Sequence, residues 1–169
     1  MHHVIERAQA RLARAEAHPF VPGGGGGAPA ITIAECYYLH DYLRKDFNNN
    51  PVEVKKLQIF LKDLEGFSNL AITGIYDDAT IAATDAFQIR YKDEVLTPWG
   101  YDGATGTDYT YILTKKKVNE IYCKHAFPVN AQQQAEIDAT RALFESLRNA
   151  GINLGNSLPS GNNGSSMPL

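Results

Sequence analysis

The stretch NPVEVKKLQIFLKDLEG at residues 50–66 decides the fold. Asn50 and Pro51 are typical of a helix start, because Asn accepts a hydrogen bond from a first-turn amide and Pro lacks the N–H that has no partner there. Glu53 is expected to bond back to the cap residue. Apolar side chains at three- and four-residue steps predict a helix over about 51–64 with one buried face; they are Val54, Leu57, Leu61 and Leu64.

Two more helices are predicted to pack against this one. Asp77 or Asp78 can cap a helix whose apolar stripe includes Ala83 and Phe87. Another helix is expected to begin near Thr114. Together they predict an all-α fold, a compact three-helix bundle around one core.

The segments between these helices are predicted to cross the bundle. Residues 35–43 carry apolar side chains at helical spacing and are expected to form a shorter helix. Residues 92–111 contain one proline and several glycines, which indicates a long ordered loop, with short strand pairing at 109–113.

Composition divides the whole chain into five parts. Residues 1–18 have apolar side chains at helical spacing and predict an amphipathic helix, followed by a Gly- and Pro-rich linker at 19–33. The predicted domain covers 34–125, and a further amphipathic helix lies within 126–152. Residues 153–169 are mostly Gly, Ser, Asn and Pro, so we expect a disordered tail.

The overall composition excludes several classes of function. With 44% hydrophobic residues and a net charge of −3, the chain has the profile of a folded domain and lacks the basic bias of a nucleic-acid binder. It has no run of about 20 apolar residues, so no membrane span is expected. Its first twenty residues carry several charges where a secretory signal would be apolar.

The stretch VKKLQIFL at residues 54–61 is similar to the V-x-x-L-Q-x-x-L that opens the motif of the peptidoglycan-binding domain family. The stretch GIYDDAT at residues 74–80 is similar to its turn D-G-x-F-G-x-x-T, and Ala83, Phe87 and Gln88 keep the spacing of its A-V-x-x-F-Q. Residues 102–106 resemble a second, weaker copy of the turn, with Tyr109 where the threonine of the motif is expected.

This resemblance implies a non-catalytic module that binds or anchors to peptidoglycan. It places the protein outside the cytoplasm, in the envelope or secreted, although the given chain lacks a signal peptide. The implied partners are peptidoglycan and another envelope protein or a hydrolase, with no cofactor, metal or nucleic acid. The alternative is a structural or assembly protein that uses the same helical fold for protein–protein contacts, with the terminal helices as the interface.

The two cysteines of the chain, Cys36 and Cys123, bracket the region of resemblance. In an oxidising compartment, a disulfide between them would close a long loop and stabilise a small core. A zinc site that also uses His40 and His125 is an alternative, although Cys-x-His is poor ligand spacing. Free buried thiols, or a Cys36 nucleophile with His40 as base, are further alternatives.

Five residues are candidate ligand contacts, because glycans are bound by flat apolar rings together with polar groups. They are Trp99, Tyr101, Tyr76, Gln88 and Thr105. A single tryptophan in a small domain is also a common core residue, and a glutamine beside an apolar stripe often ties a loop to a helix. Residues 115–117, three lysines in succession, are either a solvated face or a contact for anionic wall polymers.

Overall fold

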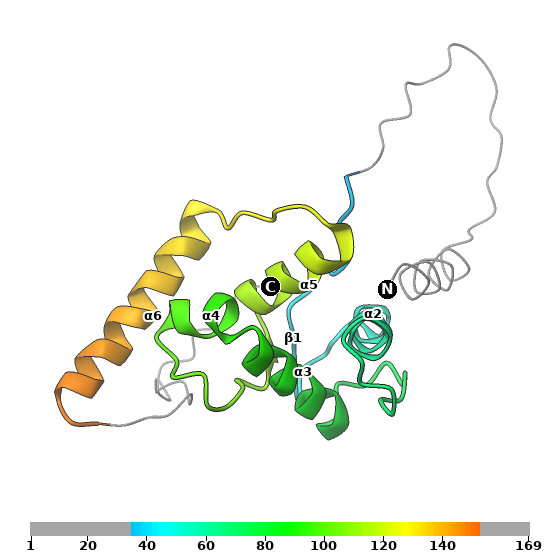
Figure 1. Cartoon of the computed structure of the whole chain (residues 1–169), viewed down its shortest axis with the longest axis horizontal. Coiled ribbons are helices and arrows are strands. Elements are labelled where there is room, and N and C mark those ends of the chain that lie inside the picture. The colour runs from blue at the N-terminus through cyan, green and yellow to red at the C-terminus, as the bar shows by residue number, and fades with distance from the viewer. Residues whose placement is uncertain (1–34, 153–169) are drawn as a thin grey trace, which may run out of the picture.

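The computed structural model describes residues 35–152, which are dominated by helices (Figure 1). Two short strands pair antiparallel, with Leu43 opposite Thr110. A predominantly helical fold is therefore confirmed, with a small sheet added. The predicted helix at 1–18, the linker at 19–33 and the tail at 153–169 lie outside the described residues. The elements, in chain order, are β1 (Leu43–Arg44), α2 (Pro51–Asp63), α3 (Asp78–Arg90), α4 (Lys92–Val95), η1 (Thr97–Trp99, a 3-10 helix), β2 (Tyr109–Thr110), α5 (Ile112–Cys123) and α6 (Ala131–Asn149).

Helices α2, α3 and α5 share the first core. Phe60 of α2 and Phe87 of α3 meet edge to face with ring centroids 5.5 Å apart, and Val118 of α5 is buried in the same cluster. Such aromatic pairs stabilise the fold by about 0.5–1.5 kcal/mol in addition to the free energy gained by burying their apolar surface. The apolar stripes predicted for α2 and α3 thus meet in one interior, and α2 begins at Pro51 as predicted, with Asn50 accepting a hydrogen bond from the amide of Val52 at 3.0 Å.

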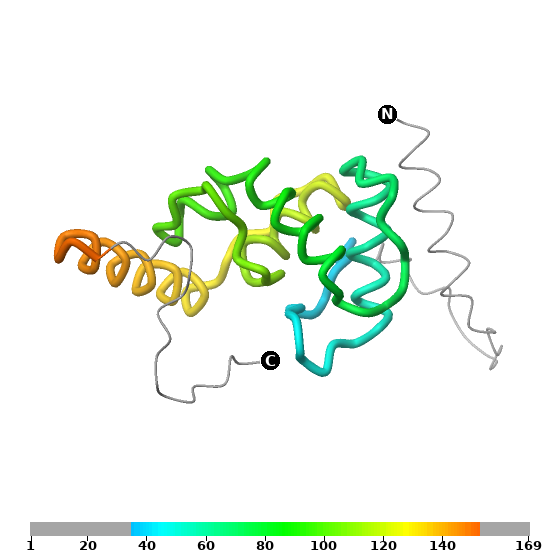
Figure 2. The backbone as a smooth tube through the Cα atoms, turned by 90° about the horizontal axis from the view of Figure 1, so that it is seen from below, coloured from blue at the N-terminus to red at the C-terminus, as the bar shows by residue number. Residues whose placement is uncertain are grey.

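A second core cluster joins α4, η1 and the start of α5 to α6. Its members are Val95, Leu96, Trp99, Tyr101, Ile112, Leu113, Ile137 and Phe144. Helix α6 begins with a capping box in which the side chains of Asn130 and Gln133 each bond the other residue's backbone amide. In Figures 1 and 2, α6 lies at one end of the described part and α2 at the other.

Residues 92–111 are more structured than a loop, which corrects that expectation. They begin with α4 and η1 and end with β2. The helical turns form because Val95 and Leu96 are buried against α6 and α5 in the second core. Gly100 ends η1 with a φ of 94°, and a Cβ there would approach the Cα of Arg141 to 3.3 Å, so its lack of a side chain allows the backbone to reach α6. Helix α5 also starts at Ile112, two residues before the predicted position.

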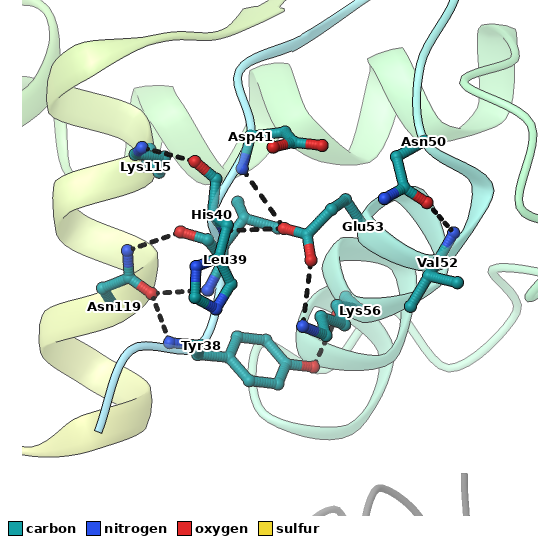
Figure 3. Close-up of polar contacts among 10 residues, drawn as sticks. All are labelled: Tyr38, Leu39, His40, Asp41, Asn50, Val52, Glu53, Lys56, Lys115 and Asn119. Atoms are coloured by element: carbon teal, nitrogen blue, oxygen red, sulfur yellow. Dashed lines mark hydrogen bonds and ion pairs between the residues drawn. The ribbon is translucent and has the colours of Figure 1, made fainter. Parts of the chain in front are cut away.

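The helix predicted at residues 35–43 does not form, because a side chain of α5 satisfies the backbone of this segment in an extended conformation. The Oδ1 atom of Asn119 accepts the amides of Tyr38 and Leu39 at 3.1 and 2.7 Å (Figure 3). Its Nδ2 atom donates to the carbonyl of Leu39 at 3.0 Å. Asn119 therefore replaces the hydrogen bonds of a neighbouring strand, and the segment runs between α5 and α2.

Glu53 of α2 holds the same segment from the other side. Its Oε2 atom accepts the amides of His40 and Asp41 at 2.6 and 3.2 Å, and its Oε1 atom accepts Lys56 Nζ at 2.9 Å (Figure 3). Only 4% of Glu53 is exposed. The expectation that Glu53 bonds back to Asn50 is therefore wrong: its carboxylate is used for a tertiary contact, and the helix is capped by Asn50 alone.

Candidate functional site

Gln58, the glutamine of the first sequence motif, holds the turn that begins the second motif. The amide of Gln58 is fully buried, and its Oε1 atom accepts the backbone amides of Thr73 and Gly74 at 2.9 and 3.0 Å. Its Nε2 atom donates to the carbonyl of Ile75 at 3.0 Å and to Thr80 Oγ1 at 2.9 Å. The φ of Gly74 is 79°, a conformation that favours glycine. The motif residues therefore hold the start of α3 against α2.

Gln88 repeats this arrangement one helix later. Its Oε1 atom accepts the amide of Thr107 at 2.8 Å, while its Nε2 atom donates to the carbonyl of Tyr109 at 2.7 Å and to Thr114 Oγ1 at 2.9 Å. Gln88 is 1% exposed. The residue therefore ties a loop and the start of α5 to α3, which was one of the two roles expected for it.

The second copy of the turn lies at residues 107–114, which corrects its assignment to 102–106. Asp108, with a φ of 61°, stands where Gly74 stands in the first copy. Asp tolerates this left-handed conformation better than most residues, because its short side chain bonds locally. The glycines of 102–106 suggested a turn there, whereas the hydrogen bonds of Gln88 show that the equivalent turn lies at 107–114.

Tyr76 and Thr105, two of the five predicted ligand contacts, lie in opposite environments. Tyr76 is 5% exposed, and its hydroxyl lies 3.1 Å from Thr110 Oγ1. Burial raises the pKa of Tyr76 to about 12. Thr105 is exposed. These two residues do not line the cavity that contains the other three.

Trp99, Tyr101 and Gln88 line one small cavity beneath α6. Its volume is about 70 Å³, and Glu136 and Thr140 of α6 line one side of it. Trp99 and Tyr101 are each 7% exposed, and the ring of Tyr101 packs against α6. Because pockets for small molecules usually enclose about 300–1,000 Å³, a cavity of this size is too small for a sugar ring. Ligand binding at these residues stays a prediction, and in this conformation their rings serve the second core.

A larger, open groove lies over α3. Its volume is about 470 Å³, and it is lined by the loop at residues 66–70 and by three alanines of α3. These alanines are Ala79, Ala82 and Ala83. None of the five predicted ligand residues lines this groove.

A cluster of rings at the surface, which we call the aromatic strip, was not predicted from the sequence. Tyr37 is 44% exposed, and its ring lies 4.8 Å from that of His40 and 5.4 Å from that of Phe127. The ring of His125 stacks on Phe127 at 4.3 Å. These residues come from two segments about 87 positions apart, so no local pattern connects them. The strip consists of Tyr37, His40, Tyr42, His125 and Phe127.

The three successive lysines have separate partners and do not form one solvated face. Lys115 Nζ donates to the carbonyl of His40 at 2.7 Å and lies 4.5 Å from the ring centre of Tyr42. The other two form ion pairs, Lys116 with Glu120 and Lys117 with Glu94. Lys115 is therefore the lysine of this run that lies beside the aromatic strip.

Cys36 and Cys123 form the predicted disulfide, with an S–S distance of 2.04 Å. The bond occupies both sulfur atoms, so the alternatives of a zinc site and of a Cys36 nucleophile do not apply to this structure. In the described residues, no group of three or more His, Cys, Asp or Glu side chains is arranged to hold a metal ion.

Asp85 of α3 lies half-buried beneath the loop that precedes β2. The pKa of its carboxyl is raised to about 6, chiefly by burial and also by the nearby carboxyl of Asp108, while the hydrogen bond from the Asp108 amide at 3.0 Å opposes the rise. A Cβ on Gly106 would lie 2.0 Å from the Asp85 carboxyl, so only glycine fits above it. The carboxyl is thus held where its charged form is disfavoured.

We expect the free energy of unfolding to fall as the pH rises from about 4 to about 6. The folded protein binds the Asp85 proton more tightly than the unfolded chain, so the favourable contribution is complete below the unfolded pKa and is lost as the pH passes the folded pKa. Because Asp85 is half exposed, screening limits the effect to about 1 kcal/mol. Denaturant titrations across this range measure it. Asp85→Asn keeps the acceptor for the Asp108 amide and should remove the change; an unaltered pH profile in Asp85→Asn would contradict the assignment.

Among residues 35–152, no helix is both long and apolar enough to cross a bilayer. Comparisons with protein-family models, with curated proteins and with solved structures found no match. The link to the peptidoglycan-binding family therefore rests on the motif residues of the chain itself.

Proposed function

We propose that the protein is a non-catalytic module that binds or anchors to peptidoglycan, built as a peptidoglycan-binding-domain-like bundle of α2, α3 and α5. The observation that carries the proposal is the resemblance of residues 54–61 and 74–88 to the family's motif. It is supported by the way these residues act together, since Gln58 and Gln88 each hold the turn before the next helix. These motif residues thus serve the scaffold, and ligand contacts must come from the surface.

The disulfide supports an extracytoplasmic location. Disulfides form and persist in oxidising compartments such as the bacterial periplasm and the exterior, and they are rare in the cytosol. The Cys36–Cys123 bond ties the start of the described part to the end of α5. A peptidoglycan-binding module that works in the envelope, alone or beside a hydrolase, fits this setting.

Sedimentation with purified peptidoglycan sacculi tests the proposal. The full chain, oxidised and at micromolar concentration, is expected to pellet with sacculi and to stay in the supernatant with cellulose. Cellulose is the control because it is an insoluble glucan without N-acetyl or peptide groups. Equal recovery with both polymers, or no recovery with sacculi, would count against peptidoglycan binding.

A protein–protein assembly role is the second candidate, and exposed apolar side chains in the second half of α6 and just after it favour it. Leu143 is 45% exposed and Ile152 is 46% exposed. If α6 forms an interface, sedimentation equilibrium should show concentration-dependent oligomers that Leu143→Glu disperses. A monomer at all concentrations would remove this candidate.

A further inference from the structure

We propose that the aromatic strip, with Lys115 beside it, is the surface that contacts the glycan chain; this inference rests on the proposed function. It assigns the contact to Tyr37 and the other residues of the strip, none of which is among the five predicted ligand residues. The ligand class is a linear polymer of N-acetylated sugars that carries carboxylate groups.

The geometry of the strip suits a chain of sugar rings. From His125 to Phe127 to Tyr37, successive ring centroids lie 4.3 and 5.4 Å apart. Beyond Tyr37, the ammonium of Lys115 lies 5.5 Å from the Tyr37 ring and 4.5 Å from the Tyr42 ring, so it connects the two. The His125 and Phe127 rings stack on each other, so one face of each is covered, and Tyr37 and His40 are the exposed rings that can contact apolar C–H groups of a polymer.

The strip is held in place before any ligand arrives. Cys36, next to Tyr37, is bonded to Cys123, and the Nε2 atom of His125 lies 3.2 Å from the carbonyl oxygen of Cys36. On the other side of Tyr37, the amide of Tyr38 is fixed by a side chain of α5. A rigid surface loses little conformational entropy on binding, which favours affinity for a shallow contact.

Lys115 adds the polar part of the recognition. An ammonium has three N–H donors, and the structure gives Lys115 one hydrogen bond, to the carbonyl of His40. That bond lies at the exposed surface, and the ammonium has two further donors beside the Tyr37 and Tyr42 rings. They can bond acetamido oxygens or carboxylates of a polymer that lies on the rings. A partner with apolar faces and anionic or acetamido substituents matches this combination better than a purely apolar protein surface.

The other two candidate surfaces fit such a polymer less well. The cavity at Trp99, which is partly lined by α6, measures only about 70 Å³. The groove over α3 is open, but one aromatic side chain, Phe67, lines it and the rest of its lining is small or polar apart from Leu70. The strip, by contrast, combines several rings with a cation.

Sacculus-binding isotherms of the full chain test the assignment with matched variants. Tyr37→Ala is expected to raise the dissociation constant by about two- to twelvefold, since one ring contact is worth about 0.5–1.5 kcal/mol. Tyr37→Phe keeps the ring and should bind within about twofold of the wild type. Phe47→Ala is the control, because Phe47 is 37% exposed, lies outside the strip and packs under Arg44. Lys115→Gln should weaken binding and reduce its dependence on salt.

The outcomes separate the two proposals. If the wild type binds sacculi and neither Tyr37→Ala nor Lys115→Gln weakens binding, the strip is not the contact, and the proposed function stands. If the wild type does not bind, both proposals fail. Thermal unfolding of each variant shows whether it is folded; if Tyr37→Ala is destabilised, Lys115→Gln alone decides.

Discussion

Replacing both Cys36 and Cys123 with Ser should lower the free energy of unfolding by about 4–5 kcal/mol. The two residues are 87 positions apart. On the chain-entropy model, a cross-link that closes so long a loop lowers the conformational entropy of the unfolded chain and destabilises it by this amount. A typical domain is stable by only about 5–15 kcal/mol, so the variant should sit near the limit of folding. Urea denaturation of the oxidised protein and the double variant measures the difference.

Reduction of the wild type provides the control for this experiment. Dithiothreitol should shift the urea midpoint of the wild type to that of the double variant and leave the variant unchanged. Midpoints that coincide with and without reductant would show that the bond contributes nothing to stability. The same loss should also loosen the aromatic strip, since Tyr37 follows Cys36 directly.

Glu53→Ala should cost about 3–5 kcal/mol of stability. Only 4% of Glu53 is exposed, and the substitution leaves the ammonium of Lys56 and two backbone amides without their acceptor. Asp78→Ala is the matched control, because Asp78 also pairs with a lysine but its side chain is 86% exposed. An exposed pair of this kind is worth about 0–1 kcal/mol, so the control should change little.

The pH dependence of the two proteins gives a second measurement of the same contact. Burial alone raises the pKa of Glu53, but the hydrogen bonds from Lys56 and from the amides of His40 and Asp41 outweigh it, so its pKa lies below the ordinary value. The stabilisation is therefore present above the ordinary pKa of a glutamate and is lost as the pH falls through the folded pKa. Urea titrations at pH 7 and pH 3 should show this loss in the wild type and not in Glu53→Ala. A cost of Glu53→Ala no larger than that of Asp78→Ala would contradict the role of this carboxylate.

Local pattern predicted the elements that local chemistry determines. Helix α2 begins at Pro51 because its capping residue and its apolar spacing lie within a few positions of one another. Helix α3 is likewise capped by Asp77, whose Oδ1 atom accepts the amide of Thr80 at 2.9 Å. The disulfide was also predictable, because only two cysteines are present and they flank the folded region.

Contacts between distant residues decided the rest. Residues 35–42 have a helical pattern but are extended, because Glu53 and Asn119 bond their backbone from up to 81 positions away. Trp99 was an open choice between core and surface, and it became buried when α6 packed over it.

The sequence by itself determined the helices α2 and α3, their shared core and the cysteine pair, because each depends on spacing, capping or the number of cysteines. Only the tertiary structure decided the path of residues 35–42, the position of the second turn at 107–114 and the aromatic strip. These depend on side chains of α2, α3 and α5 reaching backbone or rings far away in the chain. Periodicity records which face of an element is buried, and it holds no information on which distant residue supplies the partner.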